Sequence, residues 1–168
     1  FGASFEIFIA PGNHDIGSLS AADIFALSPF NFSGAKRVDS EDNVLVIEDS
    51  VSSNWLINSS ALFLLQRASG ASAFLFRHNI PIIELVKLAN STEFMSQNLP
   101  NAERFSEQFS ELDKLVVISG DSGAFISLPR QTCHRHQNFT FITNGIGETS
   151  GDRVLIIEDG TIYSYPLD

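Results

Sequence analysis

Residues 5–15 read FEIFIAPGNHD, a short apolar run followed by a polar turn. Its first part, Phe5–Ala10, is rich in aromatic and β-branched side chains, which is typical of a buried strand. Pro11 and Gly12 come next, and they end the strand and let the backbone turn tightly. The stretch therefore predicts a strand that delivers an Asn-His-Asp cluster to its carboxyl end.

Two later apolar runs also end in polar clusters. Ala73–Phe76 leads into an Arg-His-Asn cluster that contains His78, and Leu115–Ser119 leads into a Gly-Asp-Ser-Gly turn that contains Asp121. Open α/β sheets bind their ligands beyond the carboxyl ends of their strands. We therefore expect the three clusters to share one edge of a sheet.

The remaining pattern alternates strands with helices and predicts a single α/β domain spanning residues 1–168. Residues 15–42 show no clear period, apart from one helical turn expected near Ala21–Ala26. The expected strands are Val44–Ile47 and Phe139–Thr143, and Val154–Tyr165 should form a hairpin because Asp159-Gly160 suits a type I′ turn.

Two helices are expected. One is capped at Ser52, Ser53 or Asn54 and ends at Ala68, with an apolar face of Leu56, Leu62, Phe63 and Leu65. The other spans Glu103–Leu112 and should bury Phe105, Phe109 and Leu112.

The Asn-His-Asp cluster carries side chains suited to metal chemistry. Asn13 offers an amide oxygen to a hard cation, and His14 can bind a metal or act as an acid or base. Asp15 could orient the His14 ring and raise its basicity.

Pro11-Gly12-Asn13-His14-Asp15 after a strand resembles the Gly-Asn-His-Asp/Glu motif of the calcineurin-like metallophosphoesterases. The resemblance implies that Asn13 binds one of two metals and that His14 stabilises the transition state or protonates the leaving group. His78, in the element Phe76–Pro81, matches a later histidine that binds the same metal.

The family's Gly-His-x-His element is replaced here by Gly-Asp-Ser-Gly. Asp121 stands in place of the first histidine and can still bind a metal, whereas Gly123 offers no side chain. One metal would therefore keep Asn13, His78 and Asp121, and the other would be weakened. Residues 144–147, Asn-Gly-Ile-Gly, resemble the family's closing turn.

The family's Asp-x-His and Gly-Asp-x-x-Asp motifs do not occur in these 168 residues. The resemblance therefore implies the C-terminal portion of a two-sheet sandwich flanked by helices and closed by a C-terminal β-hairpin. Half a sandwich would expose a sheet edge, through which a homodimer could form.

The implied function is metal-dependent hydrolysis of phosphate mono- or diesters by metal-activated water, with Mn, Fe or Zn as the divalent ion and His14 and Asp15 as catalytic residues. Without the upstream motifs, the chain could instead be a non-catalytic, degenerate phosphoesterase-fold domain that binds or acts as a scaffold.

A competing assignment of the metal ligands uses His134 and His136, which would face the same side if they lie in a strand. The two histidines follow the Gly-Asp-Ser-Gly turn and precede a strand. Their position thus differs from that of the family's histidine pair.

The charge and composition exclude several classes of protein. A net charge of −10 argues against sequence-independent nucleic-acid binding, which depends on Lys and Arg. The single cysteine, Cys133, excludes a disulfide within the chain. No stretch of the chain has the roughly 18 consecutive apolar residues that a membrane-spanning helix needs.

Overall fold

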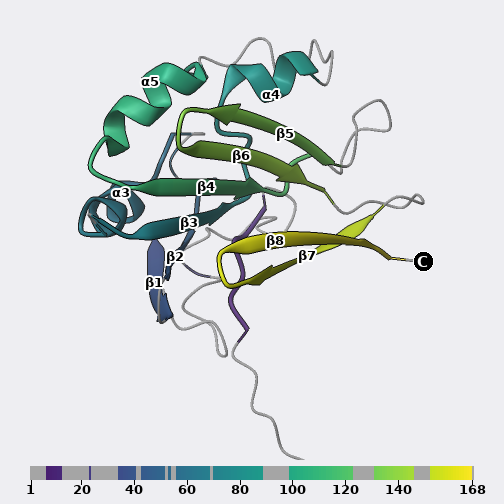
Figure 1. The fold of residues 1–168 in the computed structure, drawn as a ribbon, viewed down its shortest axis with the longest axis horizontal. Helices are drawn as coiled ribbons and strands as arrows, with labels where there is room; N and C mark the ends of the chain where they lie inside the picture. The colour runs from purple at the N-terminus through teal and green to yellow at the C-terminus, as the bar shows by residue number, and fades with distance from the viewer. Residues whose placement is uncertain are drawn as a thin grey trace, which may run out of the picture.

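The computed structural model of the chain describes residues 7–12, 23, 34–40, 43–51, 53, 56–68, 70–88, 99–122, 131–145 and 152–167. These residues form a mixed sheet of six strands, helices packed on one of its faces, and a separate two-stranded sheet (Figure 1). The expected α/β class is therefore confirmed. Within this part of the chain, no helix is long and apolar enough to cross a membrane.

The large sheet has the strand order β1-β2-β3-β4-β6-β5. Its four inner strands run parallel, and the edge strands β1 and β5 are antiparallel to their neighbours. The strands are β1 (Ala35–Ser40), β2 (Asn43–Glu48), β3 (Ser72–Arg77), β4 (Lys114–Ser119), β5 (Gln131–His136) and β6 (Phe139–Asn144). The parallel arrangement brings the carboxyl ends of β2, β3, β4 and β6 to one edge.

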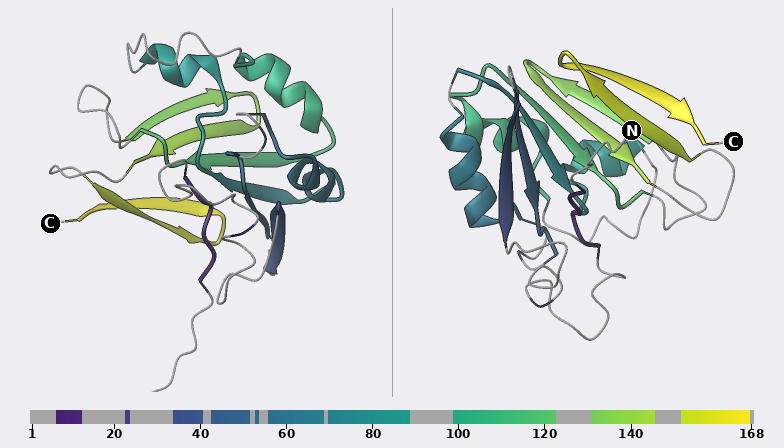
Figure 2. Two further views of the ribbon diagram at one scale, coloured as in Figure 1. Left: turned by 180° about the vertical axis from the view of Figure 1, so that it is seen from behind. Right: turned by 90° about the horizontal axis from the view of Figure 1, so that it is seen from below.

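Three helices and a short 3₁₀ helix pack on one face of this sheet (Figure 2). They are α3 (Ser59–Gln66), α4 (Ile83–Leu88), α5 (Ala102–Ser106) and the 3₁₀ helix η2 (Glu107–Phe109). The larger core lies on this face and includes Leu65, Leu75, Leu85, Phe105, Phe109, Val117 and Phe141. The predicted burial of Phe105, Phe109 and Leu112 is confirmed.

The hairpin of β7 (Arg153–Glu158) and β8 (Thr161–Pro166) lies on the opposite face of the large sheet (Figure 2). Asp159 and Gly160 both have positive φ angles, 49° and 70°, as a type I′ turn requires. The predicted hairpin is thus confirmed. A smaller core joins the two sheets through Phe74, Val116, Ile118, Ile142, Leu155, Ile157 and Ile162.

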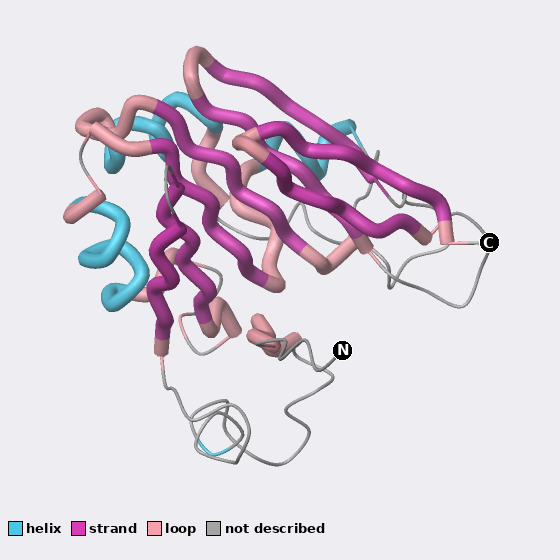
Figure 3. Tube along the Cα trace, turned by 60° about the horizontal axis from the view of Figure 1, so that its bottom comes forward, coloured by secondary structure: helices cyan, strands magenta, loops and turns pink. Residues whose placement is uncertain are grey.

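The strand expected over Phe5–Ala10 is wrong where it can be compared, because Ile7–Ala10 belongs to no strand. In Figure 3 this short segment lies below the carboxyl ends of the strands as a loop. The apolar pattern alone does not make a strand, since a strand needs a neighbour that completes its backbone hydrogen bonds. Phe5 and the helical turn expected near Ala21–Ala26, except Asp23, lie outside the described residues.

Other sequence expectations need correction. The first helix begins at Ser59, not near residue 53, because the Asn58 side chain accepts a hydrogen bond from the Ser60 amide and caps α3. Leu56 and Phe63, expected on its apolar face, are exposed. The second helix is shorter than Glu103–Leu112, since it turns into the 3₁₀ helix after Ser106.

Three elements were not expected: β1, α4 and the edge strand β5. Strand β1, with the sequence AKRVDS, is largely polar and forms by pairing antiparallel to β2. An edge strand of this kind has no apolar run to mark it. Helix α4 is a short segment of six residues, and its buried residues are Leu85 and Val86.

Candidate functional site

The site lies at the carboxyl ends of β3 and β4, where two of the predicted polar clusters meet. His78 follows β3, and Asp121 comes two residues after the end of β4. The two strands pair in parallel from Ser72 and Lys114 through Arg77 and Ser119. The register therefore ends both strands at the same level.

Backbone hydrogen bonds between the two loops then bring the side chains together. The Gly120 amide donates to the carbonyl oxygens of Arg77 and His78, at 3.2 and 3.1 Å, and the Asp121 amide donates to that of His78 at 3.0 Å. These bonds continue the strand pairing beyond the sheet. As a result, the loop after β4 lies directly against the His78 backbone.

The side chains of His78 and Asp121 face each other, with 3.3 Å between His78 Nε2 and Asp121 Oδ1. Two ligands bound about 2.1 Å from one ion at a tetrahedral angle lie about 3.4 Å apart. The observed separation therefore suits two ligands of a single divalent ion as well as a direct ion pair.

The second carboxylate oxygen of Asp121, Oδ2, is a candidate metal-binding atom. Its side chain is 6% exposed, and its Oδ2 atom is buried with no hydrogen-bond partner among the described residues. A buried carboxylate oxygen without a partner is costly. A cation bound there would remove that cost, so the donor set of imidazole nitrogen and carboxylate oxygen fits a divalent metal.

Within the described part of the chain, no three His, Cys, Asp or Glu residues are grouped so that they could hold a metal. His78 and Asp121, two of the three residues expected as ligands, do lie together. The third, Asn13, and the expected catalytic residues His14 and Asp15 lie outside the described residues, as does Gly123.

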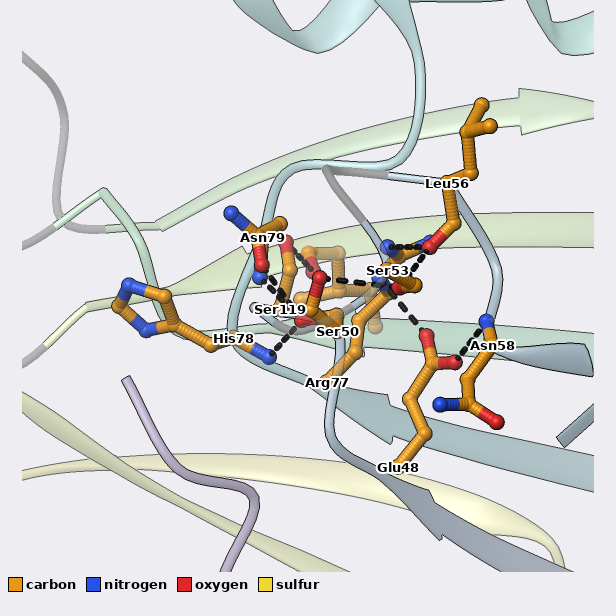
Figure 4. A network of polar contacts seen from close by, with 10 residues as sticks. Glu48, Ser50, Ser53, Leu56, Asn58, Arg77, His78, Asn79 and Ser119 are labelled. Carbon is orange, nitrogen blue, oxygen red and sulfur yellow. Dashed lines mark hydrogen bonds and ion pairs between the residues drawn. The ribbon is translucent and has the colours of Figure 1, made fainter. Parts of the chain in front are cut away.

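A buried serine holds the backbone of the His78 loop (Figure 4). Ser50 Oγ accepts hydrogen bonds from the amides of His78 and Asn79, at 3.2 and 3.1 Å. It also donates to Asn79 Oδ1 at 2.6 Å. The Ser50 hydroxyl therefore uses its one donor and both acceptor positions on the turn formed by His78 and Asn79.

We expect Ser50→Ala to destabilise the protein by about 2 kcal/mol, because each buried polar group left unsatisfied costs about 1–3 kcal/mol. Denaturant unfolding measures the change, with Ser110→Ala as the control because Ser110 is exposed. An equal effect of the two substitutions would contradict the positioning role of Ser50.

A buried ion pair lies behind this network. Glu48, at the end of β2, contacts Arg77 at the end of β3, with 3.1 Å between Oε1 and Nε. Glu48 Oε2 accepts from the amide of Asn58, the residue that caps α3, and Arg77 Nη2 donates to the Leu56 carbonyl oxygen. The pair thus joins two strand ends to the start of a helix.

Burial is the main influence on both groups of this pair. It raises the pKa of Glu48 above its ordinary value of 4.5, although the Arg77 guanidinium acts in the opposite direction. It also lowers the pKa of Arg77, against the effect of Glu48. Both shifts show that desolvation outweighs the attraction within the pair.

The competing ligands His134 and His136 lie elsewhere. Both are in β5, a strand that the sequence did not predict, and they pair with Phe141 and Phe139 of β6. Phe139 in turn pairs with Leu115, near the start of β4. Because His78 and Asp121 follow the other ends of the parallel strands, His136 lies at the opposite edge of the sheet from them.

The sequence pointed to His78 and Asp121 but did not reveal which residues support them. The supporting residues are Glu48, Ser50, Arg77 and Asn79. A Glu-Asp-Ser sequence directly after an apolar strand was a signal, since it has the same position as the other polar clusters. The sequence contained no sign that Glu48 and Arg77 would be buried as an ion pair.

Three comparisons with known proteins found no match for this chain. No family model matches the chain, and neither a curated protein nor a solved structure matches it. The case for a function therefore depends on the site itself, a His–Asp pair at the carboxyl edge of a parallel sheet.

Proposed function

We propose that this chain is a metal-dependent phosphoesterase domain, or the C-terminal portion of one, that hydrolyses phosphate mono- or diesters. The observation that carries the proposal is the His78–Asp121 pair. Its 3.3 Å separation, and an Asp121 oxygen that has no hydrogen-bond partner among the described residues, suit a divalent ion. The Gly-Asn-His-Asp motif of residues 12–15 supports the same reading. The finer fold assignment, part of a metallophosphoesterase-like sandwich, belongs to this proposal.

The proposed ligands of the ion, Mn, Fe or Zn, are Asn13, His78 and Asp121. A divalent ion supplies Lewis acidity, which polarises a phosphoryl oxygen and lowers the pKa of water. His78 offers a ring nitrogen whose direction is set by the backbone that Ser50 holds. Asp121 contributes negative charge, which offsets part of the charge of the cation.

The proposed role of His14 is to stabilise the charge that develops on the phosphoryl group or to protonate the leaving oxygen. Asp15 would keep the His14 ring in the orientation that this transfer needs. Both residues follow Gly12, and the segment 7–12 lies near His78 in Figure 4. This nearness supports the placement of the motif beside the His–Asp pair.

A non-catalytic binding or scaffold domain is the second candidate. The observation that favours it is that, within the described residues, no third His, Cys, Asp or Glu joins His78 and Asp121 as a ligand. Such a domain would bind a metal or a partner at this edge without turnover. Measurement of turnover and metal content on the same sample separates the two candidates.

We expect the Mn-loaded chain to hydrolyse 4-nitrophenyl phosphate or its bis-ester, and His14→Ala to lower kcat by about 10²–10⁴-fold, the usual contribution of a positioned acid or base. The Mn content of the variant should stay unchanged. His136→Ala is the matched control and should alter neither quantity. Bound Mn without turnover in the unaltered chain would favour the non-catalytic candidate.

A further inference from the structure

An apolar pocket of about 380 Å³ opens beside the His–Asp pair. It lies on the sheet face that the helices do not cover, between the large sheet and the segment 7–12. Its apolar lining consists of Phe8, Ala10, Leu45, Ile47, Phe76 and Ile118. Its polar end is formed by Arg77, Ser119, Gly120 and Asn144 at the carboxyl ends of the strands.

Gly120 connects this pocket to the candidate site. It lines the pocket, and a Cβ atom placed on it would lie 3.9 Å from His78 Nδ1. The alternation of side chains along β3 also puts Phe76 and the position of His78 on the same face. The pocket therefore ends at Gly120, next to the His78 ring.

The lining of the pocket defines the chemistry of its occupant. Small-molecule sites typically measure about 300–1,000 Å³ and combine a mainly apolar lining with a few polar groups at one end. Leu45 and Phe76 in the middle of the sheet are only half buried, so they keep apolar surface that a ligand could cover. The volume suits one or two aromatic rings and is too small for a helix.

A positively charged side chain, that of Lys36, lies at the β1 side of the pocket. Lys36 pairs with the lining residue Ile47, and its Nζ lies 4.2 Å from the centroid of the Phe8 ring. In a chain with a net charge of −10, a positive group at this position favours an anionic ligand locally. In an aromatic phosphoester the phosphate would lie at the His78 end of the pocket, so Lys36 would attract such a ligand only at longer range.

We propose that this pocket binds the apolar, aromatic-sized organic group of the phosphoester whose phosphate is held at His78 and Asp121. The inference rests on the proposed function and adds a substrate class to it. Esters with a small polar organic group, such as a sugar or glycerol, would leave the apolar lining uncovered. They should bind more weakly for that reason.

The test compares two non-hydrolysable probes, 1-naphthylphosphonate and methylphosphonate, by calorimetric titration of the Mn-loaded chain. Burial of about 100 Å² of additional apolar surface should make the naphthyl probe bind on the order of 50-fold more tightly. Leu45→Trp, which fills the pocket, should remove this preference and leave methylphosphonate binding unchanged. Leu45→Ala should reduce the preference several-fold, and it serves if the Trp variant does not fold.

Leu88→Trp is the matched control, because Leu88 lies on α4 at the far face and is 55% exposed. Equal binding of the two phosphonates, or a preference that survives Leu45→Trp, would overturn the pocket assignment and leave the phosphoesterase proposal standing. If neither phosphonate binds while 2-naphthol binds in a Leu45-dependent way, the phosphate site is wrong, and the ester assignment of the pocket is overturned with it.

Discussion

Glu48→Gln should destabilise the protein by about 3–5 kcal/mol, the usual cost of removing one partner from a buried ion pair. Glutamine can still accept the hydrogen bond from the Asn58 amide, so the local geometry is kept. What the variant loses is the negative charge beside Arg77, whose side chain is 1% exposed. Arginine keeps its proton in proteins, so the guanidinium would remain buried without a counter-charge.

Arg77→Met should cost less, and its cost should depend on pH. Burial already raises the pKa of Glu48 above 4.5, and removal of Arg77 takes away the influence that lowers it. The Glu48 carboxyl of the folded variant then stays protonated to a higher pH than it does in the unfolded chain. Its free energy of unfolding should therefore fall as the pH rises above about 4.5, through the raised pKa of the folded state.

Denaturant unfolding at pH 4 and pH 7 checks both expectations. The double variant Glu48→Gln/Arg77→Met removes both charges and should recover part of the loss in Glu48→Gln, which a double-mutant cycle quantifies. Glu158→Gln is the matched control, because Glu158 is exposed in the hairpin and surface changes usually lie within about 0.5 kcal/mol. A Glu48→Gln variant as stable as this control would show that the pair contributes nothing.

His78→Ala should weaken Mn binding by about 100-fold or more. Loss of a group that merely supports a metal ligand costs about 10–100-fold in affinity, so loss of a ligand itself should reach the upper end of this range or exceed it. Asp121→Asn should weaken binding less, since the amide oxygen can still bind the ion but carries no negative charge. Calorimetric titration with Mn measures both changes.

The control for His78→Ala is His134→Ala, a histidine of the edge strand β5 far from the proposed ligands. Unfolding measurements on the same samples separate lost binding from lost structure. His78 is held in place by its backbone, so its side chain, 17% exposed, should be replaceable without loss of the fold. Mn binding that is unchanged in His78→Ala would remove this residue from the metal site.

The elements that the sequence predicted well have strong local signals. The strand expected over Leu115–Ser119 is β4, because an unbroken apolar run suits a strand buried on both faces. The hairpin follows from Asp159-Gly160, which takes the two positive φ angles of its turn. In these cases a few neighbouring residues determine the conformation.

The start of α3 shows where local signals compete. Two serines and two asparagines precede this helix, at positions 52, 53, 54 and 58, and each could cap it by residue type. Asn58 is the cap in the structure, and its amide is bound in turn by Glu48 from β2. Residue type alone leaves the position of the cap open. In the structure, the cap residue Asn58 is also the one that Glu48 of β2 contacts.

By itself, then, the sequence determined the α/β class, all four parallel strands, the hairpin, and His78 and Asp121 as residues that follow strands. Only the tertiary structure decided that these two side chains face each other and that Ser50 holds the loop that carries His78. Hydrophobic period and turn chemistry act between neighbouring residues, whereas the site depends on the register of β3 against β4. That register arises only when the whole sheet packs.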